Sequence, residues 1–125
     1  MCAGLFCLEK HMKIMLYGKP ESISEAERWF GWVAESHEVF VFQTLPTAER
    51  HLIGREVNLV IMDGDDDETD WRYIADHFRE INPGLRIVLL SRSADQSVRA
   101  YDADLFDYLL KPVKKKQLQR VLSKI

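Results

Sequence analysis

The chain has few of the features that are typical of secreted proteins, of proteins stabilised by a structural metal ion, or of membrane-spanning proteins. It has two cysteines in 125 residues, Cys2 and Cys7, and their spacing fits neither a disulfide framework nor a common zinc site. The apolar stretch from Ala3 to Leu8 is too short to span a bilayer, and it lacks the basic leader and cleavage site of a signal peptide. We therefore expect a cytoplasmic protein with no membrane partner and with incidental, reduced thiols.

The chain also has no excess of basic residues. Lys and Arg number 17 against 20 Asp and Glu, which gives a net charge of -3. Proteins that bind nucleic acid through its phosphates need a basic surface, so we expect no direct nucleic-acid binding by this domain. Hydrophobic residues make up 46% and charged residues 30%, a balance typical of globular proteins and not of disordered ones.

The sequence alternates short apolar runs with helical patterns. Its length suits a single domain. We expect the domain to span 12–125, with Met12 as its natural start. Residues 1–11 are expected to be an N-terminal extension or a remnant of an expression vector. The predicted strands are 14–17, 39–42, 57–62, 87–90 and 106–110. The predicted helices are 22–36, with a capping box at Ser22 and Glu25, then 46–55, 71–81 stopped by Asn82-Pro83-Gly84, 94–102, and 113–125.

Near-continuous apolar strands that alternate with helices predict an α/β fold. The expected architecture is a flavodoxin-like, doubly wound, five-stranded parallel sheet with strand order 2-1-3-4-5 and helices on both faces. In such sheets ligands bind at the carboxyl ends of the strands. Those ends carry Gly18, Lys19 and Glu21, then Asp63 and Asp65, then Ser91 and Arg92, and finally Lys111 and Pro112.

Three of these strand ends carry motifs that together indicate a family. The motifs are Val60-Ile61-Met62-Asp63, Val88-Leu89-Leu90-Ser91 and Asp107-Tyr108-Leu109-Leu110-Lys111-Pro112. In their order and spacing they resemble the receiver domain of two-component response regulators, over 12–125. The stretch 100–108 also resembles receivers that precede a LytTR-type DNA-binding domain, which would make the chain part of a transcription regulator.

The resemblance implies a role for each matched residue. Asp63 would be the phosphoacceptor that forms an aspartyl phosphate. Ser91 and Lys111 would contact the phosphoryl oxygens, and Tyr108 would be the aromatic switch that turns inward. The peptide bond between Lys111 and Pro112 is expected to be cis. Taken singly, Asp63 would be an ordinary turn or cap residue and Ser91 a cap for the next loop. Lys111-Pro112 would be a solvated turn, and Tyr108 a half-buried aromatic of its strand.

The chain departs from the family where the metal is held. Receivers carry two adjacent acidic residues after the first strand, and these positions are Gly18 and Lys19 here. Magnesium needs oxygen ligands, and a like charge about 4 Å away costs about 4 kcal/mol at an effective dielectric near 20. We therefore expect no cofactor. The alternative is magnesium, held weakly by Glu21, Asp63 and the backbone carbonyl of Asp65.

Two further departures flank the phosphoacceptor. Arg92 stands where a small residue is usual, and the acidic run 64–68 replaces a Met-Pro. In one interpretation Lys19 and Arg92 approach Asp63 and this run and replace the charge of the metal. In the other, the run is a solvated cap at the positive end of the following helix. The sequence leaves both open.

The leading hypothesis is thus a receiver-like signalling module, not an enzyme, that acts through an output domain or partner with impaired metal-dependent phosphorylation. The alternative is a conventional magnesium-dependent phosphoreceiver in a phosphorelay, modified at Asp63 by a sensor histidine kinase. A homodimer or output domain would bind the last predicted strand and its flanking helices, where Lys114–Lys116 could pair with Asp102 and Asp104 of a second copy. An enzyme is disfavoured because no glycine-rich phosphate loop or nucleophile elbow occurs.

Overall fold

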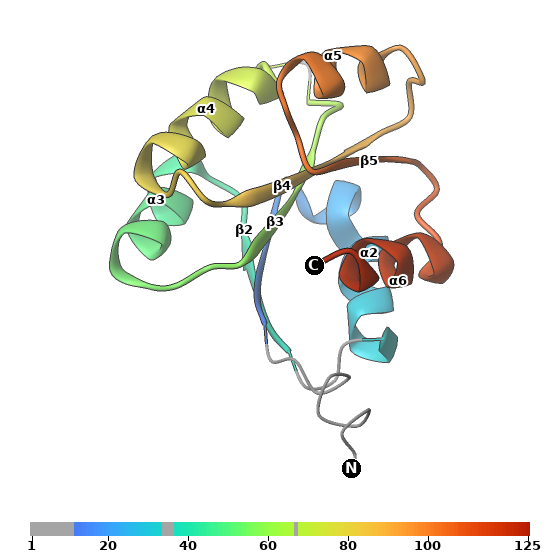
Figure 1. The fold of residues 1–125 in the computed structure, drawn as a ribbon, viewed down its shortest axis with the longest axis horizontal. Helices are drawn as coiled ribbons and strands as arrows, with labels where there is room; N and C mark the ends of the chain where they lie inside the picture. The colour runs from blue at the N-terminus through green and yellow to red at the C-terminus, as the bar shows by residue number, and fades with distance from the viewer. Residues whose placement is uncertain (1–11, 34–36, 67) are drawn as a thin grey trace.

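A computed structural model describes residues 12–33, 37–66 and 68–125 (Figure 1). Cys2, Cys7 and the expected extension 1–11 lie outside these residues. The elements, in chain order, are β1 Lys13–Tyr17, α2 Pro20–Val33, β2 Glu38–Phe42, α3 Leu45–Gly54, β3 Leu59–Asp63, α4 Trp71–Ile81, β4 Arg86–Ser91, α5 Gln96–Asp102, β5 Asp107–Leu110 and α6 Lys115–Ser123. No helix in the described part of the chain is long and apolar enough to cross a membrane.

The five strands form one parallel sheet, in the order β2-β1-β3-β4-β5. Helices α3, α4 and α5 cover one face of the sheet, and α2 and α6 cover the other (Figure 1). The predicted fold class and strand order are confirmed. Because every strand runs in the same direction, the ends of β1, β3, β4 and β5 all open on one edge of the sheet, where polar side chains from separate parts of the sequence meet.

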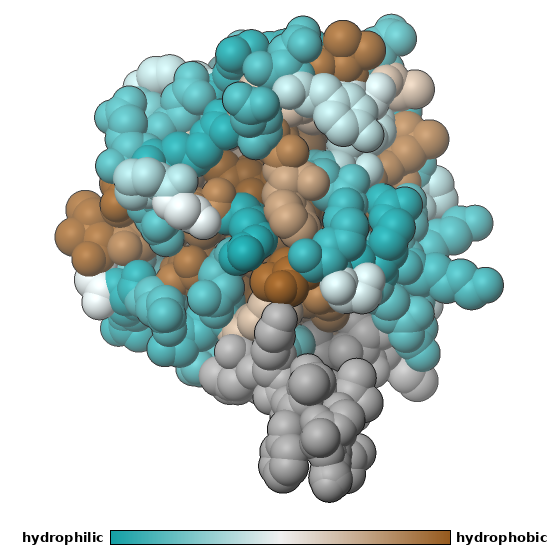
Figure 2. All heavy atoms as spheres, in the orientation of Figure 1, coloured by the Kyte–Doolittle hydropathy of each residue, from teal (hydrophilic) through white to brown (hydrophobic). Residues whose placement is uncertain are grey.

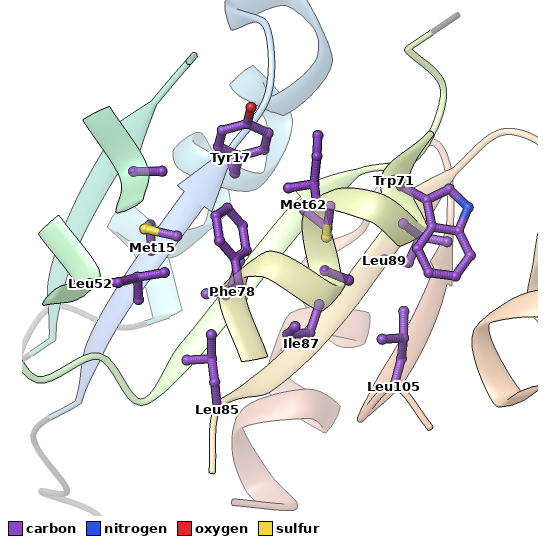
Figure 3. Close-up of a cluster of buried hydrophobic side chains, with 14 of the residues drawn as sticks. Met15, Tyr17, Leu52, Met62, Trp71, Phe78, Leu85, Ile87, Leu89 and Leu105 are labelled. Carbon is purple, nitrogen blue, oxygen red and sulfur yellow. The ribbon is translucent and has the colours of Figure 1, made fainter. Parts of the chain in front are cut away.

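Most residues of the three central strands are buried, which explains why their sequences are apolar almost without interruption. On the α3–α5 face, Phe78 of α4 is fully buried and lies edge-on to Tyr17 of β1, with 5.4 Å between the ring centroids (Figure 3). Trp71 begins α4 and is also buried, and its indole N–H donates to Gln96 of α5. The core on this face therefore ties α4 and α5 to the sheet beneath the candidate site.

The clearest sequence pattern gave the most accurate boundaries. Helix α4 ends at Ile81, as expected from Asn82-Pro83-Gly84, and Asp70 caps its start by accepting a hydrogen bond from the backbone of Arg72. Helix α3 lies one residue earlier than predicted, with Pro46 in its first turn. Local hydrogen bonds thus set the two ends of α4, and the residue types that make them can be recognised in the sequence.

Other boundaries were predicted wrongly. Helix α2 begins at Pro20, so Ser22 lies inside its first turn, where its N–H bonds to the carbonyl of Lys19, and the expected capping box with Glu25 does not form. Proline suits a first helical position because no partner for its nitrogen is needed there. The expected end of this helix, 34–36, lies outside the described residues. Strand β3 begins at Leu59 because the side chain of Asn58 turns to accept from the backbone of Lys13.

The remaining ends differ by one or two residues. Helix α5 begins at Gln96 and not at 94, since Ser93 and Ala94 form a turn in which their carbonyls accept from the N–H groups of Gln96 and Ser97. Strand β5 begins one residue late, at Asp107. Helix α6 covers Lys115–Ser123 within the predicted 113–125, and the backbone of Lys114 donates to Gln117 at its start.

Candidate functional site

The site is centred on Asp63, the last residue of β3. Its side chain is 3% exposed, and the ammonium of Lys111 lies 2.6 Å from its Oδ1. Lys111 follows β5 directly, and its backbone N–H donates to the carbonyl of Ser91 at the end of β4. The bond between Lys111 and Pro112 is cis, as expected. The structure thus brings Asp63, Ser91 and Lys111 together at the edge where the strands end.

A second carboxylate, that of Asp65, occupies the middle of the site. Its Oδ1 accepts from the hydroxyl of Ser91 at 2.7 Å, and its Oδ2 accepts from the backbone N–H of Arg92 at 2.9 Å. The ammonium of Lys111 lies 3.0 Å from the same Oδ2. The sequence suggested only the backbone carbonyl of Asp65 as a ligand, so this role of the side chain was missed.

The surroundings of Asp65 favour its charged form. Burial alone would raise its pKa, but the hydrogen bonds from Ser91, Lys111 and the backbone of Arg92 outweigh burial and hold the pKa below its usual range. Asp65 is therefore an anion at neutral pH. Lys111 is then a single cation that bridges two carboxylates, one from β3 and one from the loop that follows it.

Tyr108 is linked to this cluster through the loop after β4. The hydroxyl of Ser91 accepts from the backbone N–H of Ser93, and the phenol of Tyr108 donates to the carbonyl of Ser93. Burial of the phenol raises the pKa of Tyr108 above its ordinary value. The ring packs against the core on the α3–α5 face. The position of Tyr108 is thus connected to Ser91 by two successive hydrogen bonds.

Lys19 reaches the acidic run, as the charge-replacement interpretation expected, but it does not pair with Asp63. Within the described residues, its ammonium pairs with Asp66 at 3.9 Å and Glu68 at 3.5 Å. Asp66, and then Glu68, raise the pKa of Lys19. The side chain is about half exposed, so these pairs contribute little to stability. A long side chain that starts at the edge of the sheet reaches the solvated acidic loop before it reaches the buried carboxylate.

Arg92 contributes its backbone more than its side chain. The side chain is 79% exposed, and its Nε lies 3.5 Å from Oδ2 of Asp65. The contact is with Asp65 and not with Asp63. Of the two expected charge substitutes, then, neither contacts Asp63, and Lys111 alone among the described cations pairs with it.

The donor set does not fit a magnesium ion. Across residues 12–33, 37–66 and 68–125, no three His, Cys, Asp or Glu side chains are grouped so that they could hold a metal. Glu21 completes the alternative ligand set, but its surroundings include cations. It lines a hollow of about 360 Å³ together with Arg92 and Lys111. Asp63 and Asp65, the two carboxylates that a metal would use, are both held by an ammonium.

Gly18 adds a steric reason for the missing carboxylate. Its φ of +152° is rarely adopted by residues with a side chain, and a Cβ built there would lie 2.9 Å from the Cβ of Asp63 and 3.0 Å from Ile23. The backbone at Gly18 is held by a hydrogen bond from its N–H to the carbonyl of Phe42. In this arrangement the position next to Asp63 accepts only glycine.

We therefore expect Gly18→Ala to lower the free energy of unfolding by about 1–3 kcal/mol, through backbone strain and the clash with Asp63. The matched control is Gly31→Ala in α2, where a Cβ meets no atom within 4 Å. That substitution should instead stabilise the helix by about 0.5–1 kcal/mol. Urea denaturation of both variants measures the difference, and a Gly18→Ala protein as stable as the wild type would contradict the close approach.

Comparison with solved structures identifies the fold. No model of a protein family and no curated protein matches the sequence. A CheY-like response regulator receiver domain protein of Methanospirillum hungatei has a TM-score of 0.75 at 17% identity, over 92% of this chain and 93% of that one. A receiver domain protein of Clostridium thermocellum has a TM-score of 0.76 at 18% identity, over 90% and 92%.

The chain therefore has the fold of CheY-like response regulator receiver domains. A structure described as adenylate cyclase from Rhodopirellula baltica is equally similar, with a TM-score of 0.76 at 15% identity over 92% of this chain and 87% of that one. At such identities the likeness establishes the fold, and function has to be argued from the site itself.

Proposed function

We propose that this chain is a receiver-like signalling module of a two-component response regulator that works through contacts with an output domain or partner, with impaired metal-dependent phosphorylation of Asp63. The observation that supports it most is Lys111, which bridges Asp63 and Asp65 at 2.6 and 3.0 Å. A divalent cation in a phosphoryl-transfer site neutralises clustered carboxylates and the incoming phosphoryl group. Here an ammonium already balances the carboxylates, and the acidic pair that would recruit the ion is replaced by Gly18 and Lys19.

The burial of Asp63 also favours this proposal. Its Oδ1 accepts from the backbone N–H of Asp65 at 3.2 Å and contacts Lys111 at 2.6 Å. A nucleophilic carboxylate needs an oxygen that can reach the phosphorus atom, and the side chain of Asp63 is almost completely covered. Modification would therefore require the groups that cover Asp63, Lys111 among them, to move first.

The alternative function is a conventional phosphoreceiver, in which a sensor histidine kinase or small phosphodonor modifies Asp63 in the presence of magnesium. The convergence of Asp63, Ser91 and Lys111, with a cis bond before Pro112, favours it. In that case Ser91 and Lys111 would bind the phosphoryl oxygens and Tyr108 would respond to the shift of Ser91.

Mass spectrometry after incubation with acetyl phosphate and magnesium distinguishes the two functions. We expect the wild-type protein to gain no stoichiometric phosphoryl group, with Asp63→Asn as the control for labelling elsewhere. Stoichiometric, magnesium-dependent labelling that disappears in Asp63→Asn would contradict the proposal and establish the conventional phosphoreceiver.

For the partner surface we propose the face formed by α5, β5 and α6, which takes up either an output domain or a second copy of the chain. Hydrophobic side chains are exposed there, with Val98 63%, Tyr101 74% and Leu110 44% exposed. Figure 2 shows hydrophobic atoms at the surface over α5. The lysines 114–116 lie at the start of α6, on an element that flanks the same strand. Pairing with Asp102 and Asp104 of a second copy would add charge complementarity to this apolar contact.

A further inference from the structure

Three hydrogen-bond donors from separate segments converge on one carboxylate at the edge of the sheet. They are the hydroxyl of Ser91, the backbone N–H of Arg92 and the ammonium of Lys111, at 2.7, 2.9 and 3.0 Å from the oxygens of Asp65. Ser91 is completely buried and the side chain of Lys111 is 13% exposed. A hydroxyl, an amide and an ammonium directed at one point form a site for an oxyanion.

We propose that Asp65 is an internal anion that fills an oxyanion-binding site made by Ser91, Arg92 and Lys111, and that this site takes up an external phosphate-class oxyanion only when Asp65 is withdrawn. The inference rests on the proposed function, in which the site works without a phosphoryl group on Asp63 and Asp65 takes the place of that group. It goes further in naming the occupant and the condition under which the site opens.

The geometry explains why a side chain can hold the place of a phosphate. Asp65 is two residues beyond the end of β3, and its backbone N–H donates to Oδ1 of Asp63 at 3.2 Å, which turns the loop back over the sheet. Its two oxygens then face different donors: Oδ1 faces Ser91, and Oδ2 faces Arg92 and Lys111. The lowered pKa of Asp65 agrees with a permanently charged occupant.

The occupied site also fixes the loop that leads to α5. With its hydroxyl donating to Asp65, Ser91 accepts from the backbone of Ser93, whose carbonyl accepts from Tyr108. The carboxylate thereby holds Ser91 and, through Ser93, Tyr108 in one arrangement. The partner surface around α5 and β5 would then be kept in one state without any chemical modification.

The test is binding of inorganic phosphate to Asp65→Ala, with Asp66→Ala as the matched control. Both variants lose one carboxylate from the same loop, but Asp66 pairs with Lys19 and does not contact Ser91 or Lys111. Titrations are followed by the backbone amide signals of Arg92 and Ser93 in nitrogen-15 NMR spectra. If Asp65 fills the site in at least about 90% of wild-type molecules, its removal should tighten phosphate binding by about tenfold or more.

Three further variants test whether the gain in phosphate affinity depends on the named donors. They also cover the case in which the Asp65→Ala protein does not fold. Asp65→Ala combined with Ser91→Ala should lose most of the gain, because one of the three donors is gone. Asp65→Asn keeps the shape of the side chain but not its charge, and it should also bind phosphate more tightly than Asp66→Asn.

The result that overturns the proposal is equally specific. Folded Asp65→Ala and Asp65→Asn proteins that bind phosphate no better than the wild type or the Asp66 variants would show that Asp65 is only a structural ion-pair partner. Labelling of the wild type at Asp63 by acetyl phosphate is a separate readout and would contradict the proposed function. Phosphate binding by the Asp65 variants tests the internal anion alone.

Discussion

Replacement of Lys111 by Met is expected to lower the free energy of unfolding at neutral pH by about 3 kcal/mol, because it removes the one cation that Asp63 and Asp65 share. Methionine fills a similar volume, so the loss reflects charge and not a cavity. Among the described residues, Asp63 would then have no cation beside it and Asp65 only the exposed Arg92 at 3.5 Å, while their side chains are only 3% and 15% exposed. Denaturation by urea, monitored by circular dichroism, measures the change.

The matched control is Lys124→Met. Lys124 pairs with Asp107 at 2.8 Å, but it is 43% exposed and Asp107 keeps Arg120 at 3.2 Å. The loss there should be below about 1 kcal/mol. If Lys111→Met costs no more than Lys124→Met, the bridge does not stabilise the site.

The pH dependence gives a second signature of the same variant. In the wild type the pKa of Asp65 is lowered on folding, so its contribution is present above the unfolded pKa and is lost as the pH falls through the folded pKa. Without Lys111 two carboxylates repel each other, and at least one folded pKa should rise above its unfolded value. Lys111→Met should therefore gain stability as the pH falls from about 7 to about 5, where the wild type does not.

Most of the fold could be predicted because its determinants are local and periodic. Buried parallel strands need apolar side chains on both faces, so 87–90 and its counterparts stand out from the helices between them. Helix α4 has a regular apolar stripe and a clear stop. Errors occurred where one hydrogen bond decides a boundary, as when Asn58 bonds to β1 or when α2 begins at Pro20.

The site could be predicted in its strand-end residues and not in its loops. Asp63, Ser91 and Lys111 follow strands whose order fixes their meeting point. Lys19 and Arg92 have long, flexible side chains. Whether their charged groups pair with Asp63 or only with the acidic loop depends on distances that cannot be read from the sequence. The part played by Asp65 was missed for the same reason. Its position two residues after Asp63 was a signal, but only the turn of the loop aims its oxygens at Ser91.

In the function proposed above, the site is balanced by its own side chains and does not need a divalent ion. To bind between Asp63 and Asp65, magnesium would have to displace or approach Lys111. Unit charges about 4 Å apart repel by about 4 kcal/mol at an effective dielectric near 20, and a doubly charged ion is repelled more. That energy corresponds to about a thousandfold loss of affinity.

Titration of magnesium into the wild-type protein, followed by tryptophan fluorescence, tests this claim most directly. Trp71 lines the hollow that Asp65 and Arg92 also line, so it should report on an ion bound there. We expect no saturable change in the wild type up to roughly 10 mM, and a saturable response in Lys111→Met, whose carboxylates are freed for the ion. Saturable binding of magnesium to the wild type at sub-millimolar concentration would contradict the account.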